Sequence, residues 1–326
     1  MPPPLVLATS FLDSVDQFFS KFAAVGWGWL LIGCMFFAGF LTLRSRACFY
    51  VLRAAYPAEP FRWHRVWGAY VAGYGVNQTL PARGGNLVRL FLTKSSVPGS
   101  SYPAVASSFL VDTVFDLAVA VPILAYAFTQ GVFPKPPDFS KLNAFDLSYL
   151  ASNPRFTVFL LTGLALLVLV VFAFLSVRVK AFWARVRQGL TILSDRRRYL
   201  REVVSMQMLA WFSRFGTFWA FLEAFHVGGS VRNVLLVYGV AAVSSLIPLT
   251  PGGAGVQQAL LVKVFAGAAS GPTVAAFSVG QQIAIAALSA GLGFAALVFI
   301  FRLRSFKEVL RRGREDRRSS EAAAAR

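Results

Sequence analysis

The chain carries the stretch GYGVNQTLPARGGNLVR at residues 73–89, where an apolar run is interrupted. Pro81 breaks a helix at this point because proline lacks an amide proton and clashes with the preceding turn. Gly84 and Gly85 follow, and glycine adopts backbone conformations that other residues avoid. The interruption therefore brings a group of polar side chains to the end of an apolar segment; they are Asn77, Gln78, Arg83, Asn86 and Arg89.

A second stretch, SSLIPLTPGGAGVQQ at residues 244–258, repeats this order of features. Pro81 and Pro248 are 167 positions apart, and the two Gly-Gly pairs are 168 positions apart. Paired helix breaks in two halves of a membrane protein are typical of transporters, whose ligand binds where the broken helices meet. The two stretches therefore predict a bound or transported ligand between them.

Composition places the chain in a membrane. It is 56% hydrophobic and only 14% charged, whereas about a quarter of a soluble domain is charged. The 326 residues allow about six to eight spans of ~20 residues and leave no room for a separate soluble catalytic domain. We expect an all-α polytopic membrane protein with about five to eight transmembrane segments.

The net charge of +18 comes from 32 basic and 14 acidic side chains. The basic residues cluster beside apolar segments, where they mark the cytoplasmic side and attract anionic lipid. They form no separate basic surface, which argues against nucleic acid as a partner. The basic residues after 301 predict a cytoplasmic C-terminus, and the N-terminus lacks the features of a cleaved signal, so the first apolar segment is expected to be a retained span.

The apolar segments and flanking charges predict five full crossings and two re-entrant hairpins. The crossings are expected at about 27–43, 100–128, 156–177, 203–225 and 273–301, and the hairpins at about 64–99 and 234–268. A broken backbone is tolerated at membrane depth only where protein buries it or where it lines a cavity. The first hairpin would enter from the cytoplasm and the second from outside, so the halves have inverted topology. Short true spans in place of a hairpin are the alternative.

This topology divides the chain into a small N-terminal segment, one transmembrane domain and a basic cytoplasmic tail. The boundaries are 1–24, 25–302 and 303–326; within the domain, half one covers about 25–130, a connector span 154–177, a basic cytoplasmic segment 178–201, and half two about 203–302.

Acidic residues within the apolar segments are the first candidates for function. Asp112 and Asp116 are four positions apart and share a helical face. Each costs about 2.5 to 3.5 kcal/mol at mid-membrane, so both should face the interior. One interpretation is an ion pair with Arg83 or Arg89; the other is proton or cation coupling, or shaping the field around a headgroup. Arg214 and Glu223 are nine positions apart and are expected to have separate partners.

Arg83 and Arg89 flank the start of a short helix, where free backbone N–H groups also favour an anion. They fit a phosphate, or alternatively they are ordinary cytoplasmic anchors. The glycines after Pro251 either let a ligand approach the backbone or let helices pack closely. The predicted substrate-binding residues lie at the two breaks, on the acidic helix face and among the later glutamines; they are Asn77, Arg83, Gly85, Asn86, Arg89, Asp112, Asp116, Thr250, Gly252, Gly253, Gly255, Gln258 and Gln282.

The sequence carries no enzyme signature. His64 and His226 fall on opposite sides of the predicted topology, so no histidine-based metal site is expected. There is no nucleotide-binding loop. Asp112 and Asp116 lack the repeated acidic motif of membrane prenyl or phosphatidyl transferases. We therefore predict no cofactor, no metal, no catalytic residue and no enzymatic activity.

The two motifs resemble the flippase-like membrane domain of lysylphosphatidylglycerol synthases, including its stand-alone YbhN-like members. The likeness covers roughly 25–302. It departs from the family pattern where Asn86 replaces a glutamate, Thr113 an arginine, and Gln257 or Gln258 an acidic residue, which weakens a proton-coupled mechanism. The matching residues are Asn77, Leu80, Pro81, Arg83, Gly85 and Arg89 in the first half, and Pro248, Pro251, Gly252, Gly253 and Gly255 in the second.

The resemblance implies a bacterial inner-membrane protein that moves a lipid or lipid-linked headgroup between leaflets. Arg83 and Arg89 would bind an anionic headgroup from the cytoplasmic side, Asp112 and Asp116 would line the cleft, and the turn at 252–253 would close it from outside. The chain lacks the soluble aminoacyl transferase domain, so lysyl-lipid synthesis is not implied. Alternatives are a non-transporting scaffold that docks an envelope lipid enzyme through its basic segment, and a membrane-embedded lipid transferase. Phospholipids, glycolipids, polyprenyl-phosphate sugars and hopanoids all fit as substrates.

Overall fold

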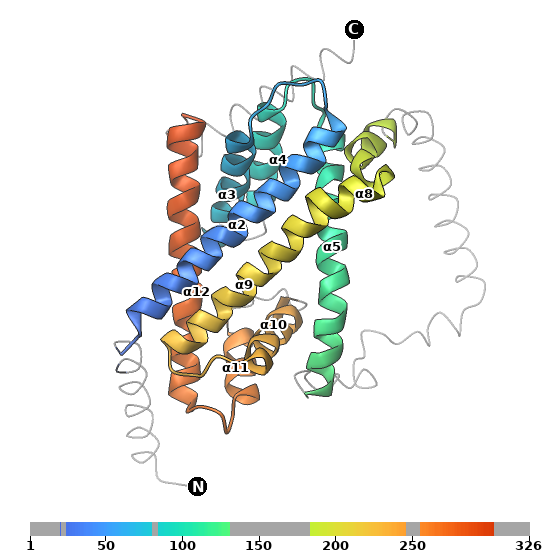
Figure 1. Cartoon of the computed structure of the whole chain (residues 1–326). Coiled ribbons are helices and arrows are strands. Elements are labelled where there is room, and N and C mark those ends of the chain that lie inside the picture. The colour runs from blue at the N-terminus through green and yellow to red at the C-terminus, as the bar shows by residue number, and fades with distance from the viewer. Residues whose placement is uncertain (1–19, 21–23, 80–83, 131–182, 246–254, 303–326) are drawn as a thin grey trace, which may run out of the picture.

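The computed structural model describes residues 20, 24–79, 84–130, 183–245 and 255–302, and these form helices joined by short turns (Figure 1). The predicted all-α fold is thus confirmed. The helices are α2 Trp27–Ala55, α3 Trp63–Thr79, α4 Gly85–Ser96, α5 Tyr102–Thr129, the 3-10 turn η4 Thr191–Ser194, α8 Arg196–Arg198, the π-helical turn η5 Tyr199–Val204, α9 Ser205–Ala224, α10 Val231–Ser245, α11 Val256–Val264, α12 Gly271–Ala295 and the π-helical turn η7 Ala296–Ile300.

Three helical stretches in the described part are long and apolar enough to cross a membrane. They are Trp27–Ala55, Tyr102–Ala127 and Gly271–Ile300, and they overlap three of the predicted crossings. The helix that contains the first predicted crossing, α2, continues past Leu43 to Ala55. The crossing predicted at 156–177 lies outside the described residues.

Helices α2 and α9 form an antiparallel pair that runs diagonally through the molecule (Figure 1). Gly26, before the start of α2, donates its backbone N–H to the carbonyl oxygen of Ala224, at the end of α9, over 2.8 Å. Further along α2, Arg44 bonds Gln207 near the start of α9. The first helices of the two halves, α2 and α9, therefore pack against each other and run in opposite directions.

Two helical hairpins hold the halves together. α3 packs against α4, and α10 packs against α11. Each hairpin also packs against the long helix of the opposite half, α3 on α12 and α10 on α5. Glycines allow this close approach: a Cβ at Gly75 would clash with the carbonyl oxygen of Ser289, and a Cβ at Gly239 would lie 2.5 Å from the Cβ of Ala127. The two halves consequently interlock.

The repeat predicted from the two motifs extends to the helices around them. Adding 167 to the bounds of α3 gives 230–246, close to the observed α10 at Val231–Ser245. Adding 167 to the bounds of α5 gives 269–296, close to the observed α12 at Gly271–Ala295. The halves thus share element order as well as local sequence.

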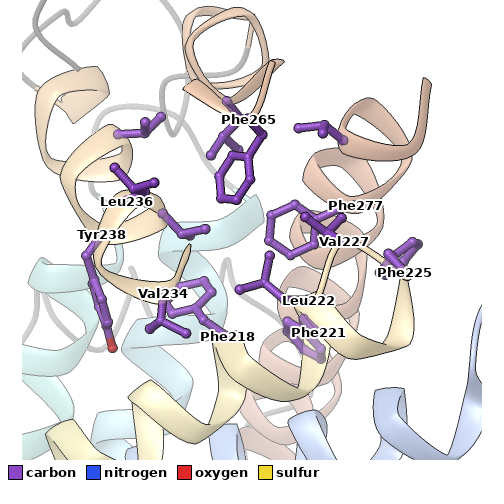
Figure 2. Close-up of a cluster of buried hydrophobic side chains, with 14 of the residues drawn as sticks. Phe218, Phe221, Leu222, Phe225, Val227, Val234, Leu236, Tyr238, Phe265 and Phe277 are labelled. Atoms are coloured by element: carbon purple, nitrogen blue, oxygen red, sulfur yellow. The ribbon is translucent and has the colours of Figure 1, made fainter. Parts of the chain in front are cut away.

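A large apolar cluster lies where α9, α10, α11 and α12 meet (Figure 2). The ring of Phe225 sits against Gly280, where a Cβ would clash with it. Close packing of this kind drives helix association in lipid, where burial of apolar surface adds little. The second half is therefore held mainly by apolar contacts; its buried aromatic members are Phe218, Phe221, Phe225, Tyr238, Phe265 and Phe277.

Candidate functional site

Asp112 on α5 is the centre of a buried polar network. Its side chain accepts hydrogen bonds from Arg89 Nη2 at 2.9 Å and from Gln207 Nε2 at 2.6 Å, one on each carboxylate oxygen. Asp112 is buried, at 4% exposure. An ion pair with Arg89 was one of the two interpretations of this residue, and the structure shows it.

Asp116 pairs with Arg44 of α2 rather than with Arg83 or Arg89. Arg44 Nη1 and Nη2 donate to its two oxygens at 2.8 and 2.6 Å, the forked geometry that makes arginine–carboxylate pairs strong. Trp211 Nε1 also donates to Asp116, at 3.3 Å. Arg44 follows the crossing predicted at about 27–43, yet it lies within α2 and is only 6% exposed.

Gln207 of α9 joins the two ion pairs into one chain. Its Oε1 accepts from Arg44 and its Nε2 donates to Asp112. This network joins side chains from α5, α2, α9 and α4, and its two arginines balance the charge of its two aspartates. Because each buried charge has a partner of opposite sign, the network avoids the large cost of isolated charges in an apolar interior. The sequence interpretation missed Gln207.

Arg89 packs against two aromatic rings. Its guanidinium carbon lies 4.3 Å from the ring centre of Tyr70 and 3.9 Å from that of Phe109, a favourable arrangement for a cation. Its Nη2 also contacts Cys48 Sγ at 3.5 Å. Only Nε is buried without a hydrogen-bond partner. The group predicted to hold a headgroup is thus ion-paired with Asp112 in this structure.

Polar side chains meet where the first hairpin is interrupted. Asn77 Nδ2, near the end of α3, donates to Asn86 Oδ1 at the start of α4 over 3.0 Å. The Oδ1 of Asn77 is buried and unpartnered. Gly85 is required here because a Cβ would clash with the carbonyl oxygen of Gly73. The structure thus brings together three of the predicted residues, Asn77, Gly85 and Asn86.

Glutamine side chains join the second hairpin to α12. Gly255 precedes α11 with a φ of 87°, a conformation that side chains other than hydrogen disfavour. Its backbone N–H donates to Gln258 Oε1. Gln258 Nε2 donates to Gln282 Oε1 at 3.2 Å, and Gln282 Nε2 donates to Gln257 Oε1 at 3.1 Å. Gly255, Gln258 and Gln282 are therefore also brought together.

Both hairpins contact the same face of α12. Gln282 bonds the start of α11, and Ser289, seven residues later, contacts Gly75 of α3. At a helical rise of ~1.5 Å per residue these two contact points lie roughly 10 Å apart along the helix. Both fall within the middle and later part of α12, so the hairpins approach each other inside the bundle.

Buried polar atoms without hydrogen-bond partners occur on α3, α10 and α12. A buried unpartnered polar group costs about 1 to 3 kcal/mol, so such groups mark positions where a polar ligand or water is favoured. In the described residues of α3, α10 and α12 these atoms are Trp63 Nε1, Asn77 Oδ1, Tyr238 Oη, Ser244 Oγ, Ser278 Oγ, Gln281 Oε1 and Ser289 Oγ.

The remaining predicted residues cannot be placed in this arrangement. Arg83, Thr250, Gly252 and Gly253 fall outside the described residues. Within the described ranges, no group of three or more histidine, cysteine or acidic side chains is arranged to hold a metal ion. Glu223 and Arg214 do not pair with each other, since Glu223 accepts from the backbone N–H of Gly229 at 2.9 Å.

The comparison with known families agrees with the broken-helix motifs. The family described as the lysylphosphatidylglycerol synthase TM region matches residues 5–293. The chain belongs to this family. The resemblance predicted from the sequence is thereby confirmed, and the match begins before the expected residue 25. No curated protein and no solved structure matches the chain significantly. Membership of the lysylphosphatidylglycerol synthase TM family supports a role connected with membrane lipids.

Proposed function

We propose that this member of the lysylphosphatidylglycerol synthase TM family moves a lipid between the two leaflets of a membrane. The meeting of two half-length hairpins on α12 carries the proposal. α3 has 17 residues and α11 has 9. At a rise of ~1.5 Å per residue, each of these helices is shorter than the ~30 Å thickness of the hydrocarbon layer. Helices that stop at mid-depth from opposite sides are the arrangement in which many transporters bind their substrate.

The polar groups at the hairpin ends suit the passage of a headgroup. The side chains of Asn77, Asn86, Gln258 and Gln282 offer both donors and acceptors at the point where the hairpins approach. A headgroup that leaves water needs such replacements, because unmade hydrogen bonds are costly in hydrocarbon. The acyl chains would remain in lipid beside the exposed apolar faces of α5 and α12, which carry Leu110, Val114, Leu117, Val121, Ile283 and Phe294.

The polar network around Asp112 supports this role by fixing the frame. Its ion pairs tie α2, α9, α5 and α4 together. At the hairpin ends, Asn77, Asn86 and Gln258 form side-chain hydrogen bonds and are uncharged amides, whose bonds are weaker than ion pairs. We therefore assign the aspartates to positioning of the helices and the amides to contact with the substrate. The moving parts in this proposal are the hairpin ends, and the ion-paired helices stay in place.

The proposed orientation follows the basic residues. The connection between α2 and α3 carries Arg62, and the N-terminal turn of α3 carries Arg65, so this end is assigned to the cytoplasm by the positive-inside bias. The first hairpin then enters from the cytoplasm, the second enters from outside, and the C-terminus lies inside. The membrane in this proposal is a bacterial inner membrane.

Leaflet exchange of fluorescent lipids in proteoliposomes tests the proposal. We expect the wild-type protein to accelerate exchange, and Gln282→Leu to slow it by about tenfold, because leucine cannot replace two hydrogen bonds at the hairpin end. Gln130→Leu is the matched control. Gln130 lies just after α5 and is exposed, so its replacement should leave the rate unchanged. Asp112→Asn is less informative because it also breaks a buried ion pair.

An absence of exchange for every lipid class tested would reject the proposal. The scaffold alternative would then apply, in which the chain docks an envelope enzyme through its basic segment. If the chain is a scaffold, reversing the charges of Arg196, Arg197 and Arg198 should abolish docking of the enzyme. If the chain transports lipid, the same charge reversal should leave the rate of leaflet exchange unchanged. These arginines form an exposed turn with no buried members.

A further inference from the structure

Arg214 is a charged side chain in the middle of α9. It follows Ser205 by nine residues and precedes Ala224 by ten. Within the described part of the chain, it makes no ion pair, and its guanidinium donates no hydrogen bond. It differs in this respect from Arg44 and Arg89, each of which is paired with an aspartate. A charge held at mid-helix without a counterion is costly and usually functional.

Four aromatic rings surround this guanidinium. Its central carbon lies 5.2 Å from the ring centre of Phe40, 5.6 Å from Tyr238, 5.8 Å from Trp211 and 5.9 Å from Phe218. The rings come from α2, α9 and α10. Aromatic faces stabilise a cation, but they do not accept its five N–H groups as a carboxylate does. The arrangement therefore holds the charge in place and leaves its donors available.

Tyr238 provides a second polar group at the same position. It is 6% exposed, and its hydroxyl has no hydrogen-bond partner. Figure 2 shows this hydroxyl directed away from the apolar cluster to which the ring belongs. The Arg214 guanidinium carbon lies 5.6 Å from the centre of the same ring. The hydroxyl and the unpaired guanidinium are both donors, and together they suit an oxyanion.

Both hairpins reach this aromatic group. Tyr238 belongs to α10 of the second hairpin. Tyr74 of α3, in the first hairpin, packs against Phe40 with ring centres 6.5 Å apart. Arg214 therefore lies at the junction of the α2–α9 pair with both hairpins, which is where a headgroup would pass under the proposed function.

We propose that Arg214 and the Tyr238 hydroxyl bind the phosphate group of a lipid at mid-membrane. The inference rests on the proposed function and adds the two residues that hold the phosphate of the headgroup. The two N–H groups of the guanidinium fork match two phosphate oxygens, and the Tyr238 hydroxyl donates a hydrogen bond to an oxygen of the same phosphate. Phosphate binding here compensates the charge of Arg214 and satisfies Tyr238 together.

Binding is tested first, without transport, on the purified full chain in neutral detergent. The probes are dihexanoyl phosphatidylglycerol, inorganic phosphate and phosphate-free dihexanoylglycerol, each titrated while the melting temperature is followed. We expect saturable stabilisation of the wild type by the phospholipid, about tenfold weaker apparent affinity for Arg214→Gln and a smaller loss for Arg214→Lys, which keeps the charge but not the fork. Tyr238→Phe should weaken binding too.

Arg46 provides the matched control. Its guanidinium also lies over aromatic rings, 5.4 Å from Phe49, 5.1 Å from Tyr50 and 5.2 Å from Trp63, but in the later part of α2, away from the hairpin ends. Arg46→Gln should leave the phospholipid affinity unchanged. Equal affinities of wild type and Arg214→Gln would overturn the proposal, and equal losses in Arg46→Gln would show a general effect of basic residues and overturn it as well.

The other probes separate the sources of the phosphate. Saturation by inorganic phosphate at the same concentrations would identify a free-anion site and overturn the assignment to a lipid. If Arg214→Gln does not fold, Arg214→Lys and Tyr238→Phe carry the comparison. In the exchange experiment, Arg214→Gln should lower the exchange rate of a fluorescent phosphatidylglycerol and leave the exchange rate of a phosphate-free glycolipid unchanged. Absence of wild-type exchange together with Arg214-dependent binding would reject the transport proposal and retain the phosphate site.

Discussion

The ion pair between Arg89 and Asp112 is buried, whereas that between Arg198 and Glu202 is not. The side chains of the first pair are 15% and 5% exposed, and those of the second 36% and 21%. Removing one partner of a buried pair leaves an uncompensated charge and costs about 3 to 5 kcal/mol. An exposed pair four residues apart in a helix contributes about 0.3 to 0.5 kcal/mol.

Asp112→Asn should therefore lower the free energy of unfolding by about 3 kcal/mol, and Glu202→Gln by no more than about 0.5 kcal/mol. Both changes replace a carboxylate with an amide of the same shape. Denaturant unfolding of the purified proteins in detergent, followed by tryptophan fluorescence, measures the difference. Equal losses in the two variants would show that the network does not stabilise the bundle.

The sequence predicts one half of this network and misses the other. Asp112 and Asp116 stand out because acidic residues are expensive inside apolar segments. Arg44 does not, because arginines after an apolar run usually mark its end. A signal was nevertheless present: Leu41, Cys48 and Leu52 are buried on the same helical face as Arg44, so the apolar periodicity continues through it.

At the scale of elements, the contact between α3 and α12 depends on a glycine. A Cβ at Gly75 would clash with the carbonyl oxygen of Ser289, which is backbone and has little freedom to move. We expect Gly75→Ala to separate the two helices and to lower the melting temperature by several degrees, a loss of about 1 to 3 kcal/mol typical of overpacking.

Gly291→Ala is the control for this prediction. Gly291 lies on α12 as well, and a Cβ there would meet nothing within 4 Å. Alanine is the better helix former by about 1 kcal/mol, so this variant should be as stable as the wild type or more stable. If the Gly75→Ala protein has the same melting temperature as the wild type, α3 does not pack on α12 as closely as described.

The hairpins were easier to predict than their partners. Proline and glycine interrupt a helix through local sterics, which a sequence displays directly. Which long helix α3 and α10 pack against depends on contacts between residues far apart in sequence, such as Gly75 with Ser289 and Gly239 with Ala127. No local pattern contains that information, and the packing of α3 on α12 and of α10 on α5 was accordingly not predicted.

At the scale of the whole molecule, the proposed insertion places the outer ends of the two hairpins on opposite sides of the membrane. Arg62 and Pro98 flank the first hairpin, Arg232 and Ala268 flank the second, and all four are exposed. Single cysteines at these positions, in a chain with Cys34 and Cys48 replaced by alanine, should react with a membrane-impermeant maleimide from one side only. We expect 62 and 98 to react from the cytoplasm, and 232 and 268 from outside.

Reaction of positions 62 and 98 from opposite sides would contradict a re-entrant hairpin and would support two short true spans in its place. The same holds for positions 232 and 268. The motif spacing of about 167 residues and the basic residues predict the inverted arrangement independently. The antiparallel pairing of α2 with α9 in the structure agrees with it.

The most direct test of the central claim is the accessibility of inner-leaflet lipid in vesicles that contain the wild-type protein. Fluorescent phosphatidylglycerol is placed in both leaflets, and dithionite, which does not cross the membrane, is added outside. In protein-free vesicles the remaining fluorescence should level off at the share of the probe in the inner leaflet. If the chain moves lipid between leaflets, the remaining fluorescence in vesicles that carry the protein should fall well below that share. Identical curves in the two preparations, repeated with zwitterionic, glycosylated and polyprenyl-phosphate lipids, would contradict the account.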